Sequence, residues 1–365
     1  MKKPDFKTIT IVGVGLIGGS LGLALRRRLP SVSVLGVDKP IVLKRAMKRG
    51  AISRGARDLN TAMSRSDLVI LATPIRDILR LLPVIARTAS KDMVVTDVGS
   101  VKESVMKKAN RLFPQGNFIG GHPMAGVELT GIEAAHPLLF ENAVYVLTPS
   151  VHAKRKQTRR LAGLLEFLGA RTLIMDAQTH DEVAAAVSHM PQLAAVALMN
   201  VAGRRHAKAS EYLRLAAGGF RDLTRIASSK YRLWSHILPA NREKTARALG
   251  LLIRELRSYQ GALKGNRFGQ LEASFGSARK LRNAIPKDMK GFLHDLATVQ
   301  VFVPDRPGML ARITVALSSQ KINIKDIELM KVREGTGGTF RLSFATTEEA
   351  RRAATVLKKK GFEIV

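Results

Sequence analysis

The chain has 365 residues, more than one compact domain usually holds, and 45% of them are hydrophobic, which is typical of globular proteins. It contains no cysteine, which excludes disulfides, thiolate metal ligands and a cysteine nucleophile. Lysine and arginine outnumber aspartate and glutamate by 60 to 29, but only 5% of the residues are aromatic, so a basic surface is favoured over a nucleic-acid groove.

Near the N-terminus, two lysines precede an apolar run from Ile9 to Leu25, which superficially resembles a signal peptide. The run contains five glycines and leads into three arginines, with no small-residue cleavage site. No other stretch is expected to approach the ~18 uncharged apolar residues of a membrane helix. We therefore expect a cytoplasmic protein that does not contact a membrane.

Short apolar runs alternate with helical patterns over the first half of the chain. The runs predict strands at residues 8–13, 32–38, 68–72 and 93–98, with further candidates at 118–119 and 143–147, and helices at 16–29, 41–48 and 75–88. Continuous apolar strands that alternate with helices are typical of a parallel, doubly wound sheet. We predict a Rossmann-like α/β domain over residues 1–175.

The pattern changes twice in the second half. Residues 181–203, 211–217, 223–237 and 242–263 have helical periodicity, which predicts an all-helical domain over 176–285. Pro286 and Gly291 mark a linker over 286–296. Residues 297–365 then show strand, helix, two strands, helix and strand, at 298–303, 308–319, 322–332, 339–345, 347–360 and 362–365, which is the ferredoxin-like βαββαβ order.

A glycine-rich turn joins the first predicted strand to the first helix, and its six residues are Gly13, Val14, Gly15, Leu16, Ile17 and Gly18. This GxGxxG pattern allows a tight turn, a close backbone approach to a pyrophosphate and close helix packing. Asp38 ends the next strand about 20 residues later, where a carboxylate accepts a ribose 2′-hydroxyl and repels a 2′-phosphate. NAD is therefore favoured over NADP, although Lys39 stands beside this carboxylate.

Two later loops, residues 97–102 and 120–126, follow strands of the same predicted sheet. Ligands collect at the carboxyl ends of parallel strands, so both loops are expected to border the cofactor. His122 lies among glycines and a proline, where an imidazole can take up a proton, and Ser100 can hydrogen-bond beside it. A histidine that merely caps a strand fits the composition equally well.

These residues carry a resemblance. The segments GVGLIGGSLGLALR, Ala72-Thr73-Pro74, DVGSVK, GGHPMAG, THDEVAAAVSHMPQ and GGFRDLTRIA occur in the order typical of the prephenate/arogenate dehydrogenase family of tyrosine biosynthesis, which the chain resembles over residues 7–265. The segment VPDRPGML resembles the start of an ACT domain.

The resemblance implies NAD(P)-dependent oxidative decarboxylation, of prephenate to 4-hydroxyphenylpyruvate or of arogenate to tyrosine. His122 would be the catalytic group, bonded to the ring hydroxyl, with Ser100 holding that hydroxyl or orienting His122. Arg225 would bind the side-chain carboxylate, with Asp222 orienting it. The remaining expected substrate-site residues are His180, His189, Gln192 and Trp234, and the cofactor would also contact Ala72, Thr73, Pro74, Asp97 and Ser100. Hydride transfer needs no metal, and none is expected.

Gln192 departs from the family pattern, because many members have a second histidine there in an H-x-P-H motif. Glutamine can hydrogen-bond but cannot carry a titrating positive charge. Prephenate ends in a keto acid and arogenate in an amino acid, so this departure leaves the choice between the two substrates open.

The ACT resemblance implies an amino-acid site at Asp305, Pro307 and Gly308, with tyrosine as feedback effector, and a homodimer. A dimerisation module with a degenerate site is the alternative. Three other readings of the whole chain compete with the main one. They are a β-hydroxyacid dehydrogenase, an amino-acid sensor whose dinucleotide site is vestigial, and a nucleic-acid-binding protein suggested by charge alone.

Overall fold

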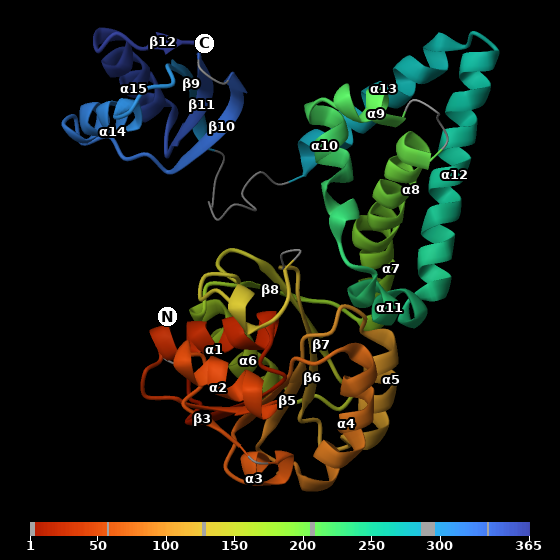
Figure 1. Ribbon diagram of the computed structural model, residues 1–365. Coiled ribbons are helices and arrows are strands. Elements are labelled where there is room, and N and C mark those ends of the chain that lie inside the picture. Colours follow the sequence, from red (N-terminus) through yellow and green to blue (C-terminus); the bar gives the residue numbers. More distant parts are fainter. Residues whose placement is uncertain (1–3, 57, 126–128, 205–208, 286–295, 334–335) are drawn as a thin grey trace. The chain divides into compact units, whose positions relative to one another are not determined.

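The computed structural model describes residues 4–56, 58–125, 129–204, 209–285, 296–333 and 336–365 (Figure 1). The chain divides into two compact units, Met1–Ala278 and Arg279–Val365. Residues 286–295 of the predicted linker lie outside the described part of the chain.

The first unit contains an eight-stranded sheet in the order β3-β2-β1-β4-β5-β6-β7-β8. The strands are β1 Thr8–Val12, β2 Ser33–Val37, β3 Arg54–Gly55, β4 Leu68–Leu71, β5 Val94–Asp97, β6 Phe118–Pro123, β7 Val144–Pro149 and β8 Arg171–Ile174. The central strands β4 and β5 are buried at every residue, which explains the continuous apolar sequence of β4, whereas β5 ends in the buried polar residues Thr96 and Asp97. The predicted Rossmann-like sheet is confirmed.

One pair of neighbours, β6 and β7, is antiparallel, whereas the other pairs of this sheet are parallel. The described residues between β6 and β7 hold a short 3₁₀ turn, η1 (Ile132–Ala134), and no α-helix that could carry the chain back for a parallel crossover. Pairing with β7 extends β6 as far as Pro123, so His122 lies on a strand opposite Val146 rather than in the loop expected from its glycine neighbours.

Helices cover both faces of the sheet (Figure 1). On one face, α1 (Leu16–Arg28), α2 (Pro40–Lys48) and α6 (Arg155–Phe167) pack on a core that includes Ile9, Ile11 and Val34. On the other, α3 (Leu59–Met63), α4 (Ile75–Thr88) and α5 (Glu103–Leu112) pack on Val69, Leu71 and Val95. Both layers are built mainly of apolar side chains.

The helical part of the first unit begins with three consecutive segments, α7 (Ala177–Ala184), the π-helical turn η2 (Ala185–His189) and α8 (Met190–Arg204). Pro191 has no N–H and would clash with the carbonyl four residues back in a regular α-helix. The wider turn relieves this crowding, and Met190 N–H donates to the Ala185 carbonyl. His189, the last residue of this turn, is 1% exposed.

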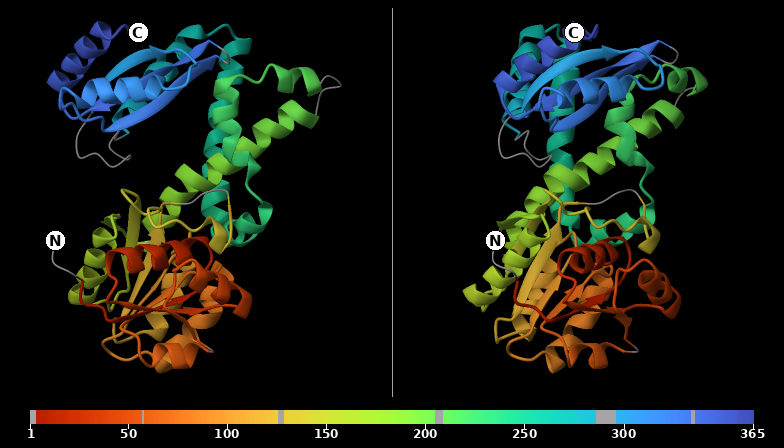
Figure 2. Two further views of the ribbon diagram at one scale, coloured as in Figure 1. Left: turned by 60° about the vertical axis from the view of Figure 1, so that its left-hand side comes forward. Right: turned by 90° about the vertical axis from the view of Figure 1, so that its left-hand side faces the viewer.

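The remaining elements of this part are α9 (Ala209–Arg214), α10 (Gly218–Thr224), η3 (Arg225–Ser228), α11 (Tyr231–Ala240), α12 (Arg242–Lys264) and α13 (Phe268–Ala284). The continuous helix predicted at 223–237 is wrong, because Ser229 and Lys230 are extended and separate η3 from α11. Both views of Figure 2 show α8 and α12 as long helices that extend away from the sheet.

One expectation about apolar stretches also needs correcting. The continuous helical stretch Ala177–Gly203 is long and apolar enough to pass a length-and-composition test for a membrane span. Only 28% of its most apolar window is buried. Its polar residues His180, Asp181 and Gln192 are buried and hydrogen-bonded to other parts of the first unit, so the helix serves the site described below.

The second unit contains a four-stranded sheet in the order β10-β11-β9-β12 with antiparallel neighbours. Its elements are β9 (Ala297–Val303), α14 (Met309–Ser318), β10 (Asp326–Arg333), β11 (Gly337–Phe344), α15 (Thr347–Lys359) and β12 (Glu363–Ile364). Both helices pack on the apolar residues of β9 and β11. The ferredoxin-like order predicted for this segment is confirmed.

Candidate active site

The glycine turn between β1 and α1 forms a cradle for a dinucleotide. Gly13 has a φ of +91°, and a Cβ there would lie 2.6 Å from the Ala72 carbonyl oxygen. A Cβ on Gly18 would lie 2.0 Å from the Gly13 carbonyl oxygen, so helix and turn pack too closely for any side chain. A Cβ on Gly15 would meet nothing within 4 Å, which leaves the start of α1 open to a pyrophosphate.

Side chains around this turn also fit a dinucleotide. The Asp38 carboxylate accepts hydrogen bonds from Val14 N–H and Lys39 N–H, both at 2.7 Å, which fixes it at the end of β2. Thr73 lies against Gly13, and its hydroxyl is buried with no hydrogen-bond partner among the described residues. An anchored carboxylate at the end of β2 is what the ribose of NAD requires of such a site.

We expect Asp38→Asn to weaken the preference for NAD over NADP, because the charge that repels a 2′-phosphate is lost. A charge-assisted hydrogen bond contributes ~1.5–3 kcal/mol, so the ratio of kcat/KM for the two cofactors should fall at least ~10-fold. Steady-state kinetics with each cofactor measure the ratio, with the exposed Asp92→Asn as control. An unchanged ratio in Asp38→Asn would contradict the assignment.

A buried ion pair lies beside the cradle, at the ends of β5 and β6. Lys102, on the loop after β5, is 0% exposed and its ammonium contacts the Asp97 carboxylate and donates to the Gly121 carbonyl at 2.8 Å. Asp97 also accepts hydrogen bonds from Gly99 N–H at 2.9 Å and Gly121 N–H at 3.2 Å. Burial lowers the pKa of Lys102, and the Asp97 carboxylate opposes that shift. The pair thus holds together the two segments that carry Ser100 and His122.

His122 is half-buried on β6, and its ring contacts that of His180 on α7. Its Nδ1 lies 2.8 Å from His180 Nε2, and the two rings meet edge to face with centroids 5.0 Å apart. Burial lowers the pKa of His122 well below 6.5, and the neighbouring His180, Lys102 and His189 lower it further. His122 is therefore uncharged at neutral pH and can accept a proton.

His189 forms a second buried centre with residues of α11 and α12. Its Nδ1 accepts from the Asn241 amide at 3.3 Å, and the Thr245 hydroxyl lies 3.4 Å away. Burial lowers the pKa of His189 to about 4, although the Asp181 charge opposes the shift. The ring of Trp234 meets it edge to face at 5.9 Å, and the Trp234 indole N–H is buried without a hydrogen-bond partner among the described residues. His189 is thus a neutral ring whose proton is on Nε2, because Nδ1 accepts the hydrogen bond from Asn241.

The remaining expected substrate residues lie on α8 and around η3. Gln192 is 5% exposed, and its side-chain amide donates to the Ile226 carbonyl at 3.0 Å. Arg225 precedes Ile226 at the start of η3, and Asp222 lies on α10; both are exposed. Gln192, the residue that departs from the family motif, is therefore an uncharged amide, and its hydrogen bond joins α8 to the segment that carries Arg225.

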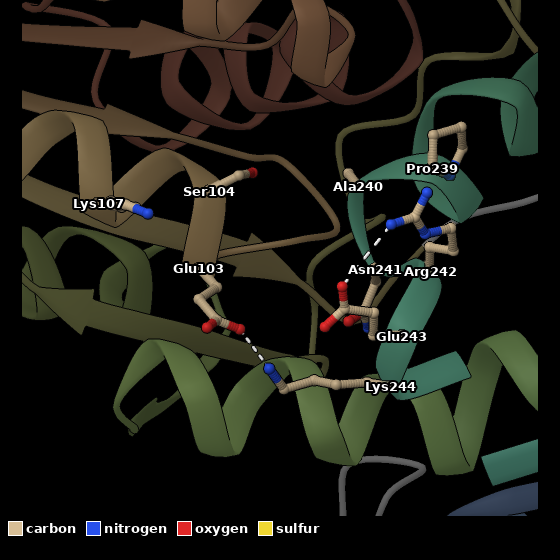
Figure 3. Close-up of a pocket in the computed structure, with 9 residues that line it drawn as sticks. All are labelled: Glu103, Ser104, Lys107, Pro239, Ala240, Asn241, Arg242, Glu243 and Lys244. Atoms are coloured by element: carbon tan, nitrogen blue, oxygen red, sulfur yellow. Dashed lines mark hydrogen bonds and ion pairs between the residues drawn. The ribbon is translucent and has the colours of Figure 1, made fainter. Parts of the chain in front are cut away.

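A small pocket lies next to the histidines, between the start of α5 and the corner where α11 meets α12 (Figure 3). Its volume is about 270 Å³. In Figure 3 Glu103 faces Lys244 and Arg242 faces Glu243, and both contacts are ion pairs. Asn241 belongs both to this lining and to the contacts of His189. Lys244 and Glu103 thus join α12 to α5 directly behind the site.

Three buried residues of this site are absent from the candidates that sequence analysis identified. Lys102 and Asp181 stand inside the motifs DVGSVK and THDEVAAAVSHMPQ, so their motifs gave a signal, but their side chains were not singled out. Asn241 lies outside every motif, and the one sequence signal for it is its position directly before the long helix α12. Its amide also donates to the Asp181 carbonyl at 2.7 Å.

In the second unit, the predicted effector residues lie on the exposed turn between β9 and α14. Gly308 has a φ of +82° and precedes α14, a conformation that favours glycine. Asp305 and Pro307 precede it on the same turn.

A dinucleotide cradle with a neutral histidine at the carboxyl edge of the same sheet defines a nucleotide-dependent oxidoreductase. Family models agree: prephenate dehydrogenase, nucleotide-binding domain, matches residues 21–174, the dimerization domain of the same enzyme matches 176–277, and the ACT domain matches 297–360. The chain belongs to the prephenate dehydrogenase family.

Individual proteins show how far the likeness extends. A prephenate dehydrogenase of Lactococcus lactis is 35% identical over 97% of this chain and 98% of its own length. The prephenate dehydrogenase of A. aeolicus, solved with hydroxyphenyl propionate and NAD+, is 28% identical with a TM-score of 0.72, over 78% of this chain and 100% of that one. An arogenate dehydrogenase of Synechocystis is 30% identical with a TM-score of 0.67, over 76% and 99%.

Proposed function

We propose that this protein oxidises prephenate with NAD and releases carbon dioxide, giving 4-hydroxyphenylpyruvate. The observation that carries the proposal is the uncharged His122 at the end of β6, at the same edge of the sheet as the open glycine turn. Prephenate is preferred over arogenate because the L. lactis relative, 35% identical over 97% of this chain, is a prephenate dehydrogenase.

Each polar group then has a chemical task. NAD, when bound, accepts a hydride from the ring carbon that carries the hydroxyl. His122 Nε2 takes the hydroxyl proton as the carbon–oxygen double bond forms, and Ser100 hydrogen-bonds the same oxygen. Loss of carbon dioxide leaves an aromatic ring with a phenolate oxygen, and His122 can return its proton to that oxygen. The reaction therefore needs no net proton from solvent.

Turnover is tested by following NADH absorbance with prephenate and, separately, with arogenate, under NAD and then NADP. We expect prephenate with NAD to give the highest kcat/KM. The absence of turnover with both substrates and both cofactors would reject the proposal, and a preference for arogenate would correct the substrate.

Arg225 is proposed to bind the side-chain carboxylate of the substrate through its planar guanidinium. We expect Arg225→Ala to raise the KM for prephenate ~10–100-fold, since hydrogen bonds to charged groups contribute ~1.5–3 kcal/mol, while the KM for NAD stays constant. Initial-rate kinetics measure both constants, and Arg221→Ala on the neighbouring helix is the control. A normal KM for prephenate in Arg225→Ala would remove this residue from the site.

The second unit is proposed to bind tyrosine as a feedback effector at the turn of Asp305, Pro307 and Gly308. We expect tyrosine to inhibit the full chain and Asp305→Ala to weaken that inhibition. If tyrosine inhibits Asp305→Ala as strongly as the wild type, the effector site lies elsewhere.

We also propose a homodimer formed by the helical part, which exposes large apolar side chains such as Leu223, Leu251 and Phe275 and matches a dimerization domain. A cytoplasmic location is proposed because the longest apolar helix carries buried polar residues into the site.

A further inference from the structure

His180 and Asp181 form a chain of hydrogen bonds that ends at His122. Asp181 is 1% exposed, and its two oxygens accept from Lys102 N–H at 2.7 Å and Glu103 N–H at 2.9 Å. The same carboxylate lies 2.7 Å from His180 Nδ1. An ionised carboxylate has no proton to donate, so Asp181 acts toward His180 as an acceptor. His180 Nδ1 is therefore the donor in this contact.

The direction of this first bond determines the next one. A neutral imidazole that donates from Nδ1 carries a lone pair on Nε2. His180 Nε2 lies 2.8 Å from His122 Nδ1, so toward a neutral His180 it is His122 Nδ1 that carries the proton and donates. His122 is thereby left with its lone pair on Nε2, the nitrogen that faces away from His180.

We propose that His180 is a positioning residue that holds His122 in the Nδ1–H form, with Nε2 as the proton acceptor, and that Asp181 fixes His180 for this task. This inference rests on the proposed role of His122 as the base. When Nε2 takes the substrate proton, His122 becomes an imidazolium whose Nδ1–H remains bonded to His180, and the Asp181 carboxylate supplies a counter-charge at the far end of the chain.

The burial of His180 and Asp181 makes the arrangement specific. His180 is 2% exposed, so water does not compete for either of its ring nitrogens. Both nitrogens are engaged by protein groups, which leaves none to bind the substrate directly. Free neutral histidine prefers the opposite form, with the proton on Nε2, and without His180 that preference would return and remove the lone pair from the reacting nitrogen.

The test reads the protonation of His122 directly, without substrate. Full-length protein with ¹⁵N-labelled histidines is examined by two-dimensional NMR at neutral pH, and His122→Asn identifies the signals of His122. We expect the Nδ1–H form in the wild type and the Nε2–H form, or a mixture, in His180→Leu. His180→Gln, whose carbonyl can accept from His122, should restore part of the Nδ1–H population. An unchanged His122 spectrum in His180→Leu would overturn the proposal.

Kinetics supply the second readout. In His180→Leu, kcat with prephenate should fall ~10–100-fold while the KM for NAD is unchanged, with partial recovery in His180→Gln. His236 is also a histidine of the helical part and is half-buried, so His236→Leu is the matched control for the loss of a histidine. It should change neither kcat nor the KM for NAD. A normal kcat in His180→Leu would also overturn the proposal. If the wild type does not turn over prephenate at all, the proposed function fails, and the NMR result still decides the tautomer.

Discussion

His122→Asn is expected to lower kcat with prephenate by about 10²–10⁴-fold, which is the usual contribution of a positioned acid–base group. The NAD dissociation constant should stay nearly the same, because His122 lies on β6, whereas the dinucleotide cradle is built from β1, α1 and the end of β2. Stopped-time assays of NADH formation and fluorescence titration with NAD measure the two quantities.

The pH dependence follows from the pKa of His122, which burial and the neighbouring His180, Lys102 and His189 hold well below 6.5. In the role proposed for His122 the neutral ring is the active form, so kcat should remain high as the pH falls through 6.5 and decline only below the depressed pKa. A profile whose acid limb lies at or above pH 6.5 would contradict the assignment. The residual activity of His122→Asn should lack this limb, and the exposed His152→Asn should retain it.

Lys102→Met is expected to destabilise the first unit strongly. Removing one partner of a buried ion pair costs ~3–5 kcal/mol, because the other charge stays buried without compensation. The partner here is Asp97, 0% exposed, and the substitution also takes a donor from the Gly121 carbonyl. For a unit of this size the loss corresponds to a fall in Tm of about 10 °C. Thermal unfolding followed by circular dichroism measures it.

Two variants show whether the ion pair is the cause. Lys107→Met, on the exposed surface of α5, should leave the Tm unchanged. The double variant Asp97→Asn with Lys102→Met removes both charges and should be more stable than Lys102→Met alone. If Lys102→Met unfolds within about 1 °C of the wild type, the pair does not stabilise the fold as proposed.

The mostly parallel sheet could be predicted from sequence because its central strands are short and largely apolar and alternate with segments of helical periodicity. The strand-borne position of His122 could not, since glycines on either side suggest a loop. Gly121 is required there for another reason: a Cβ would lie 2.5 Å from the Asp97 carbonyl oxygen, so the glycine permits β5 and β6 to approach. That requirement depends on tertiary packing, which single-residue preferences do not contain.

The same limit applies to the residues around the histidines. Resemblance of motifs located His122, His180 and His189. The hydrogen bond from Asn241 to Asp181, however, joins residues 60 positions apart and follows only from the packing of α12 on α7. The break at Ser229 and Lys230 is equally invisible to periodicity, because both residues tolerate helical and extended backbone.

The Asp181 carboxylate accepts hydrogen bonds from Lys102 N–H and Glu103 N–H, where α5 begins. The Asp181 backbone carbonyl accepts a further hydrogen bond from the Asn241 side-chain amide. This one acidic residue on α7 therefore joins three segments, α7 itself, the start of α5 and the residue before α12, which could otherwise be exchanged separately. The two backbone amides lie in the first matched family segment and Asp181 in the second, so a chimera that takes its sheet from this protein and its helices from a relative keeps these hydrogen bonds only if the relative also supplies an aspartate at this position.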